Sequence, residues 1–265
     1  RAERVLVTGC SAGGLAAYLH ADYVHGVLKA AGAPLRRFKA APISGFFLRH
    51  ASLEGVPVYA EQMRNAFQMS NATGGLSARC VAAQGEEDRW QCSFAARAYA
   101  HVEAPIFALN SALDSWQTKC IFAARLEPGF PEQNGTGNGR CAAVPGWSRC
   151  SEDPEACNAT QMGVMNQYME DFKRAMLTAG EAWRRDGNGA FIDSCHMHCE
   201  AQVDHAWSTI AIGGVTMQQA LSSWWKSDSA AASEHAHTDC SYRTAATPHE
   251  CNPTCSAKSG SVYFV

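Results

Sequence analysis

The 265-residue sequence lacks the features that mark several large classes of protein. Basic residues are not in excess, because 22 Lys and Arg stand against 25 Asp and Glu, for a formal net charge of −3. We therefore expect neither a nucleic acid nor an anionic membrane as partner. No apolar run approaches the length of a membrane span. With 46% hydrophobic and 18% charged residues, the composition is typical of a globular domain with a proper core.

Two common glycine-rich motifs are also missing. A phosphate-binding loop needs Gly-Lys-Ser/Thr, and a dinucleotide fingerprint needs Gly where Ser11 stands. Residues 9–13 instead match G-x-S-x-G, the nucleophile elbow of serine hydrolases, with an apolar strand before them and a helix after them. The glycines permit a tight turn, and the Ala12 N–H at the helix start is the expected oxyanion donor. The alternative is a glycine-rich turn that only lets a helix pack closely on a strand.

Hydrophobic periodicity predicts that short strands alternate with helices. The helix over residues 12–31 is expected to bury one stripe, made of Leu15, Leu19, Tyr23 and Val27. A longer helix is expected to start at the N-cap Thr160 and to bury Val164, Tyr168, Met169, Phe172 and Met176. The other expected elements are strands at 38–43, 104–110 and 190–194 and helices near 59–67 and at 217–225. No internal repeat or long linker separates two domains.

Twelve cysteines and three glycosylation sequons, at Asn71, Asn134 and Asn158, indicate the secretory pathway and a disulfide-bonded protein. A cytosolic protein with free thiols or zinc is the alternative. We expect Cys10 to be buried and free beside Ser11, which leaves an odd number of other cysteines.

Cysteine and histidine also cluster in two places, residues 195–199 and 235–240. These are zinc-like ligand types, but their spacing matches no standard structural zinc pattern. A secreted chain favours disulfides, so we expect no metal site.

A serine hydroxyl needs an adjacent base to remove its proton, and the base needs an acid to fix its tautomer. In α/β-hydrolases the acid and then the base follow the serine, each on a loop after a strand. Asp114 follows the strand over residues 104–110 and is the expected acid. Asp193 lies inside a strand, and Asp204 comes after the candidate histidines. An ordinary solvated loop carboxylate is the alternative for Asp114.

The base is less well determined by chain order. His196 and His198 follow the strand over residues 190–194 and lie between two cysteines that would make the loop rigid, and His205 comes soon after. From the residues alone, all three histidines remain open.

Four blocks of sequence resemble the pectin acetylesterase family, which also contains the animal protein deacylase Notum. They are residues 8–14, 105–117, 194–199 and 251–255, in the family's order and over nearly the whole chain. Cys10, residues 114–117 and Cys199 are closer to the plant-type members.

The resemblance implies an α/β-hydrolase-like three-layer sandwich and a triad of Ser11, Asp114 and His198, with Trp116 at the substrate. The implied activity is that of a secreted serine carboxylesterase, extracellular or in the cell wall. It would remove O-acetyl groups from a polysaccharide such as pectin through an acyl-enzyme, without a cofactor. A Notum-like deacylase of a lipid-modified secreted protein and an inactive extracellular binding module are the alternatives. The oligomeric state is left open.

Two departures from the family pattern are expected to matter. Ile43 stands where we expect an acid in relatives, which weakens any claim about substrate preference. The Gly-rich oxyanion loop that would supply a second donor is absent, and the chain starts at Arg1. We therefore expect residues 1–265 to be a single catalytic domain that is incomplete at its N-terminus. Within it, residues 127–157 would form a Cys- and Gly-rich excursion or lid, and residues 240–265 a disulfide-held tail.

Overall fold

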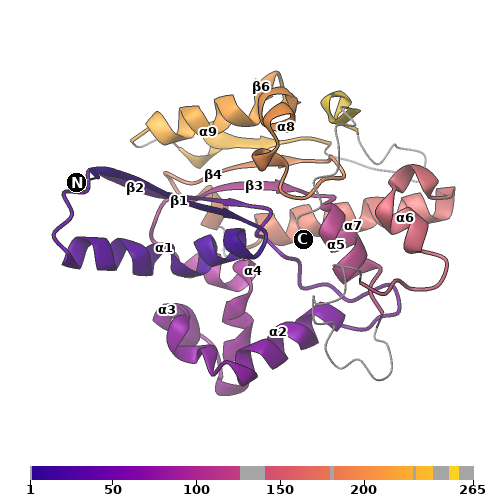
Figure 1. Ribbon diagram of the computed structural model, residues 1–265, viewed down its shortest axis with the longest axis horizontal. Helices are drawn as coiled ribbons and strands as arrows, with labels where there is room; N and C mark the ends of the chain where they lie inside the picture. The colour runs from indigo at the N-terminus through magenta and orange to yellow at the C-terminus, as the bar shows by residue number, and fades with distance from the viewer. Residues whose placement is uncertain (1, 126–140, 180–181, 229–230, 241–250, 257–265) are drawn as a thin grey trace.

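The computed structural model describes residues 2–125, 141–179, 182–228, 231–240 and 251–256. Its centre is a five-stranded parallel sheet in the order β1-β2-β3-β4-β7 (Figure 1). The strands are β1 Arg4–Cys10, β2 Arg37–Ile43, β3 Phe107–Ser111, β4 Gly189–Asp193 and β7 Ala236–Thr238. Because all five strands run the same way, the loops that follow them meet at one edge of the sheet.

Helices cover both faces of this sheet (Figure 1). On one face, α1 (Ala12–Ala30) and α7 (Ala159–Leu177) share a core with Ala108 and Ile192. On the other, α8 (Asp204–Thr209) and α9 (Met217–Lys226) pack over the neighbouring strand residues Phe107, Leu109 and Phe191. Adjacent strand residues thus point to opposite cores, as in a sheet buried on both sides. The expected α/β fold with three layers, of the α/β-hydrolase-like kind, is confirmed.

The remaining elements lie in the connections. They are α2 Val58–Met69, α3 Ala78–Ala82, α4 Ala95–Ala98, α5 Ser115–Gln117, α6 Ser148–Glu152 and a small hairpin of β5 Ala211–Ile212 and β6 Val215–Thr216. In the part of the chain that the structure describes, no helix has the length and apolarity needed to cross a membrane.

The buried stripe expected on α1 is only half right. Leu15 is buried, but Tyr23 is 71% exposed and Val27 is 49% exposed. Four residues turn an α-helix by more than one full turn, so a repeat of four drifts around the helix and leaves the buried face. The face that packs on the sheet is instead built from Gly14, Leu15, Ala17, Tyr18 and Ala21.

The N-cap expected for α7 is also wrong, by two residues. Asn158, not Thr160, is the N-cap, and it forms a reciprocal capping box with Gln161. Of the stripe predicted for this helix, Val164 is 37% exposed and the other four members are buried.

All twelve cysteines form disulfides, so the expectation of a free Cys10 is wrong. The pairs are Cys10–Cys199, Cys80–Cys92, Cys120–Cys141, Cys150–Cys157, Cys195–Cys255 and Cys240–Cys251. Both cysteine–histidine clusters therefore lack the thiolates that a zinc site of that kind would need. Of the excursion or lid expected over residues 127–157 and the disulfide-held tail expected over residues 240–265, residues 127–140, 241–250 and 257–265 lie outside the described chain.

Candidate functional site

The turn from β1 into α1 holds Ser11 in a conformation that non-glycine residues rarely adopt. Its φ is 58° and its ψ is −122°, and its N–H donates to the carbonyl of Ile43 at 3.0 Å. A Cβ on Gly9 would lie 2.7 Å from the Gly13 backbone, so the turn closes only around glycine. Such a strained serine at a strand-to-helix corner has the geometry of a nucleophile elbow.

A second pair of glycines fixes this corner against β2. A Cβ on Gly14 would lie 2.3 Å from the Ile43 carbonyl, and one on Gly45 would lie 2.2 Å from the Gly14 carbonyl carbon. The first turn of α1 therefore rests directly on the turn that follows β2. This contact also sets the position of Ser44, which is fully buried with a φ of 45°.

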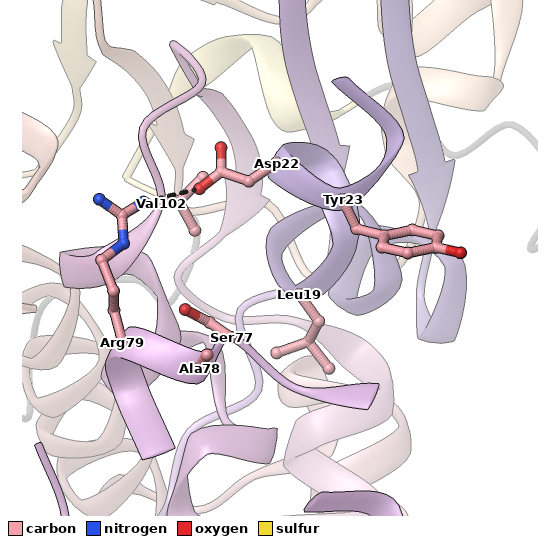
Figure 2. Close-up of a pocket in the computed structure, with 7 residues that line it drawn as sticks. All are labelled: Leu19, Asp22, Tyr23, Ser77, Ala78, Arg79 and Val102. Carbon is pink, nitrogen blue, oxygen red and sulfur yellow. Dashed lines mark hydrogen bonds and ion pairs between the residues drawn. The ribbon is translucent and has the colours of Figure 1, made fainter. Parts of the chain in front are cut away.

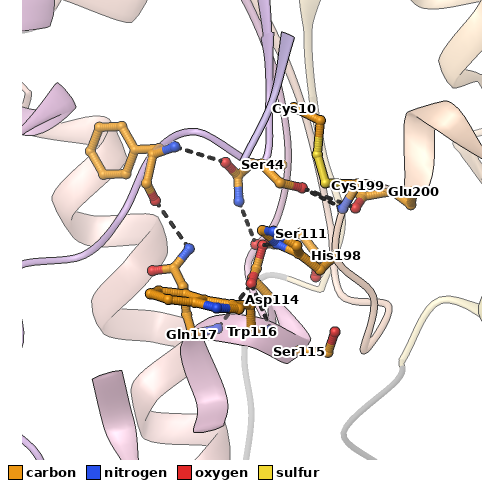
Figure 3. Close-up of polar contacts among 12 residues, drawn as sticks. Cys10, Ser44, Ser111, Asp114, Ser115, Trp116, Gln117, His198, Cys199 and Glu200 are labelled. Atoms are coloured by element: carbon orange, nitrogen blue, oxygen red, sulfur yellow. Dashed lines mark hydrogen bonds and ion pairs between the residues drawn. A yellow bond between two sulfur atoms is a disulfide. The ribbon is translucent and has the colours of Figure 1, made fainter. Parts of the chain in front are cut away.

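Asp114 lies on the loop between β3 and α5 and uses its two oxygens differently (Figure 3). Oδ1 accepts the N–H groups of Trp116 and Gln117, each at 3.0 Å, and so caps α5. Oδ2 lies 2.7 Å from Nδ1 of His198. Because the cap fixes the carboxylate, its second oxygen is held in place for the imidazole.

His198 lies on the loop after β4, and each end of that loop is bonded elsewhere in the chain. Cys195 is bonded to Cys255 and Cys199 to Cys10. Burial lowers the pKa of His198, but the charge and hydrogen bond of Asp114, together with the charge of Glu200, outweigh it and raise the pKa above its usual value. The protonated form of the His198 imidazole is therefore stabilised relative to the neutral form.

The Cys10–Cys199 disulfide joins the residue before Ser11 to the residue after His198 (Figure 3 shows the disulfide beside His198). The two α-carbons lie 5.7 Å apart although 189 positions separate them in sequence. The elbow and the histidine loop are thus neighbours. Ala12, the first residue of α1, is exposed at the same corner, and its N–H belongs to the first turn, whose amides have no partner within a helix.

The other candidates from sequence lie in different surroundings. His196 contacts the Thr118 hydroxyl through Nε2 at 3.0 Å, and His205 is exposed on α8. Asp193 is buried within β4 and accepts the Cys195 N–H at 2.9 Å, and Asp204 is exposed at the start of α8. Asp114 is the one of the three candidate acids that contacts His198.

Aromatic side chains lie beside His198. The ring centroid of Trp116 is 6.3 Å from that of His198, and its indole packs edge-on against Phe47 and Tyr59. Trp116 is half-buried, so its side chain is only partly covered by these neighbours.

Two residues of the site escaped the sequence analysis, Ser44 and Glu200. The hydroxyl of Ser44 accepts the Cys199 N–H at 2.9 Å and donates to Glu200 Oε2 at 3.3 Å. Glu200 is fully buried. Its place two positions after His198 was the only signal, and an acidic residue in a loop ordinarily points to solvent.

A hollow of about 270 Å³ lies between α1 and α3 and shares no residue with this site (Figure 2). Arg79 in its wall contacts both Asp22 and Glu103. The charge of the Arg79 guanidinium is thus neutralised by acidic partners within the chain. The hollow is lined by Leu19, Asp22, Tyr23, Ser77, Ala78, Arg79 and Val102.

Comparison with known proteins agrees with this geometry. The model of the pectinacetylesterase family matches residues 1–256. Pectin acetylesterase 5 of Arabidopsis thaliana is 26% identical over 96% of this chain and 52% of its own length. Pectin acetylesterases 11 and 7 of the same plant are each 26% identical over 97% of this chain and 58% of their own lengths. The chain thus spans about half the length of the curated relatives it matches.

Proposed function

Because the chain belongs to the pectinacetylesterase family, we propose that it carries the triad of a serine carboxylesterase that removes O-acetyl groups from a cell-wall polysaccharide such as pectin. The observation that carries the proposal is the 2.7 Å contact between Asp114 and His198 on a loop bonded to the nucleophile corner. Six disulfides favour an oxidising compartment, and we propose that the protein is secreted.

In the first half of the reaction, Nε2 of His198 accepts the proton of Ser11 as its Oγ attacks the carbonyl carbon of the acetyl ester. The Nδ1–H of His198 donates to Asp114, which fixes the tautomer and stabilises the imidazolium. The Ala12 N–H donates to the oxyanion. His198 then gives its proton to the sugar oxygen, the bond between that oxygen and the carbonyl carbon breaks, and the acetyl group remains on Ser11 Oγ.

In the second half, water replaces the sugar hydroxyl. His198 accepts a proton from this water as the water oxygen attacks the acyl-enzyme, and returns the proton to Ser11 Oγ as acetic acid leaves and ionises to acetate in solvent. The face of Trp116 would hold the sugar ring while these steps proceed. The chain's own side chains supply every proton transfer in this scheme.

A panel of model esters tests the proposal. Acetyl esters should be hydrolysed faster than octanoyl esters, acetate should be released from acetylated pectin, and a fluorophosphonate should label the peptide that contains Ser11. Heat-denatured protein, which should not be labelled, is the control. A preference for octanoyl esters would favour a protein deacylase, and folded protein without label would favour a binding module.

The Cys10–Cys199 disulfide should matter more for activity than for folding. Removing both cysteines as the C10A/C199A variant should lower kcat about 100-fold, because a displacement of about 1 Å between nucleophile and base costs about that much. The free energy of unfolding should fall by about 2–4 kcal/mol. Denaturant titration and initial rates measure the two effects.

The matched control is the C80A/C92A variant, which removes the disulfide that joins α3 to the segment between α3 and α4. It should lose stability but keep kcat. Equal loss of kcat in both variants would show that the first disulfide acts only through stability.

A further inference from the structure

Glu200 is a buried acid that the reaction scheme above does not use. Its carboxyl group is fully buried, and Oε2 accepts a hydrogen bond from the Ser44 hydroxyl at 3.3 Å. The same hydroxyl accepts the N–H of Cys199 at 2.9 Å, as Figure 3 shows. Among the described residues, Oε1 forms no hydrogen bond to another residue. A buried acid whose only side-chain hydrogen-bond partner among the described residues is a neutral hydroxyl is costly for stability, so a function is the better explanation.

Ser44 is a fixed anchor for this acid. It is buried at the end of β2, its φ is 45°, and its N–H donates to the Leu109 carbonyl at 2.8 Å. Because the Ser44 backbone is held against β3, its hydroxyl is a fixed partner for the histidine loop. Through it, the Cys199 backbone and the Glu200 carboxylate, which follow His198 by one and two positions, are held at the carboxyl end of the sheet.

Charged groups face Glu200 from three elements. His198 comes from its own loop, Asp114 from the loop after β3, and Asp193 from β4, with Asp239 beyond Asp193. Burial raises the pKa of Glu200 to about 7, its own backbone and His198 oppose this rise, and Asp114 adds to it.

We propose that Glu200 is a positioning residue for His198, which holds the histidine loop through Ser44 and presents a second carboxylate to the imidazolium that forms when Ser11 is deprotonated. This inference rests on the proposed function and deepens it. Asp114 would orient the ring by direct contact, and Glu200 would act through charge and through the loop.

The sign of the effect follows from the charges. An ionised Glu200 favours protonated His198 and contributes to the raised pKa of this histidine. Activity requires neutral His198, so it declines as the pH falls through that pKa. Without the Glu200 charge, His198 stays neutral to lower pH. The acid limb of the activity profile should therefore shift to lower pH.

The test is the E200Q variant, in which the amide oxygen of glutamine still accepts the Ser44 hydroxyl. The acid limb of kcat/KM for an acetyl ester should shift by about half a pH unit or more to lower pH. The plateau rate should fall about three- to tenfold, because one charge that stabilises the imidazolium is gone. Glu200→Asp keeps the charge and should retain the wild-type limb even if its rate is lower. Glu61→Gln, on the exposed start of α2, is the control without effect.

An NMR titration of the His198 imidazole separates this inference from the proposed function, since it needs no substrate. Unsubstituted chain should show two steps, because coupled groups titrate as a pair, and E200Q should show one step at lower pH. If no ester is hydrolysed but these titrations appear, the pairing of Glu200 with His198 holds and the esterase proposal fails. A single step in the unsubstituted chain, or an unmoved limb and titration in E200Q, would overturn the role of Glu200.

Discussion

Replacing Ser11 by alanine should lower kcat for acetyl ester hydrolysis about 10⁶-fold, the loss seen when a triad serine is removed. Alanine has no oxygen to attack the ester, so no acyl-enzyme forms and fluorophosphonate labelling should disappear. The variant should still fold, because the corner depends on the glycines at positions 9, 14 and 45 and on the Ser11 backbone.

Ser115→Ala is the matched control for this variant. Ser115 is the first residue of α5 and lies next to Asp114 in the same site, but it takes no part in the proposed reaction. Its loss should change the rate severalfold at most. Rates and labelling by intact-protein mass spectrometry decide the matter, and undiminished turnover by Ser11→Ala would rule out the serine mechanism.

Replacing Asp114 by asparagine should lower kcat about 10⁴-fold through a change of tautomer. The asparagine Oδ1 can keep the cap on the N–H groups of Trp116 and Gln117, but its Nδ2 would donate where Oδ2 now accepts. His198 must then accept at Nδ1, so Nε2 carries the proton. Such an imidazole cannot take a proton from Ser11.

Asp114→Ala separates this effect from the structural one. It should lose the cap of α5 as well, which costs about 1 kcal/mol of unfolding free energy, whereas Asp114→Asn should unfold like the unsubstituted chain. Thermal denaturation and initial rates report on both. An Asp114→Asn variant with nearly full activity would show that another group orients the imidazole.

The parts of this structure that could be predicted from sequence are those with strong local signals. The strand and the helix around Ser11 follow from an apolar run, two glycines and a periodic pattern. Chain order and family resemblance selected Asp114 and His198, which the structure brings within hydrogen-bonding distance.

The errors came where three-dimensional contacts outweigh local patterns. Tyr23 fits an apolar repeat but faces away from the core, because small residues of α1 pack on the sheet instead. Asn158 competes with Thr160 as a cap, and the partner Gln161 decides between them. The pairing of Cys10 with Cys199 joins residues 189 positions apart, and no local signal predicts such a pair.

The Cys10–Cys199 bridge also has a consequence for biosynthesis. One cysteine is made near the start of this chain and the other after most of it, so a ribosome-bound chain holds the nucleophile corner long before its base. The bridge then needs an oxidant to form. In a copy that matures under reducing conditions, no disulfide would join the loop that carries Ser11 to the loop that carries His198. Formation of this bridge in an oxidising compartment would accordingly raise the proposed esterase activity.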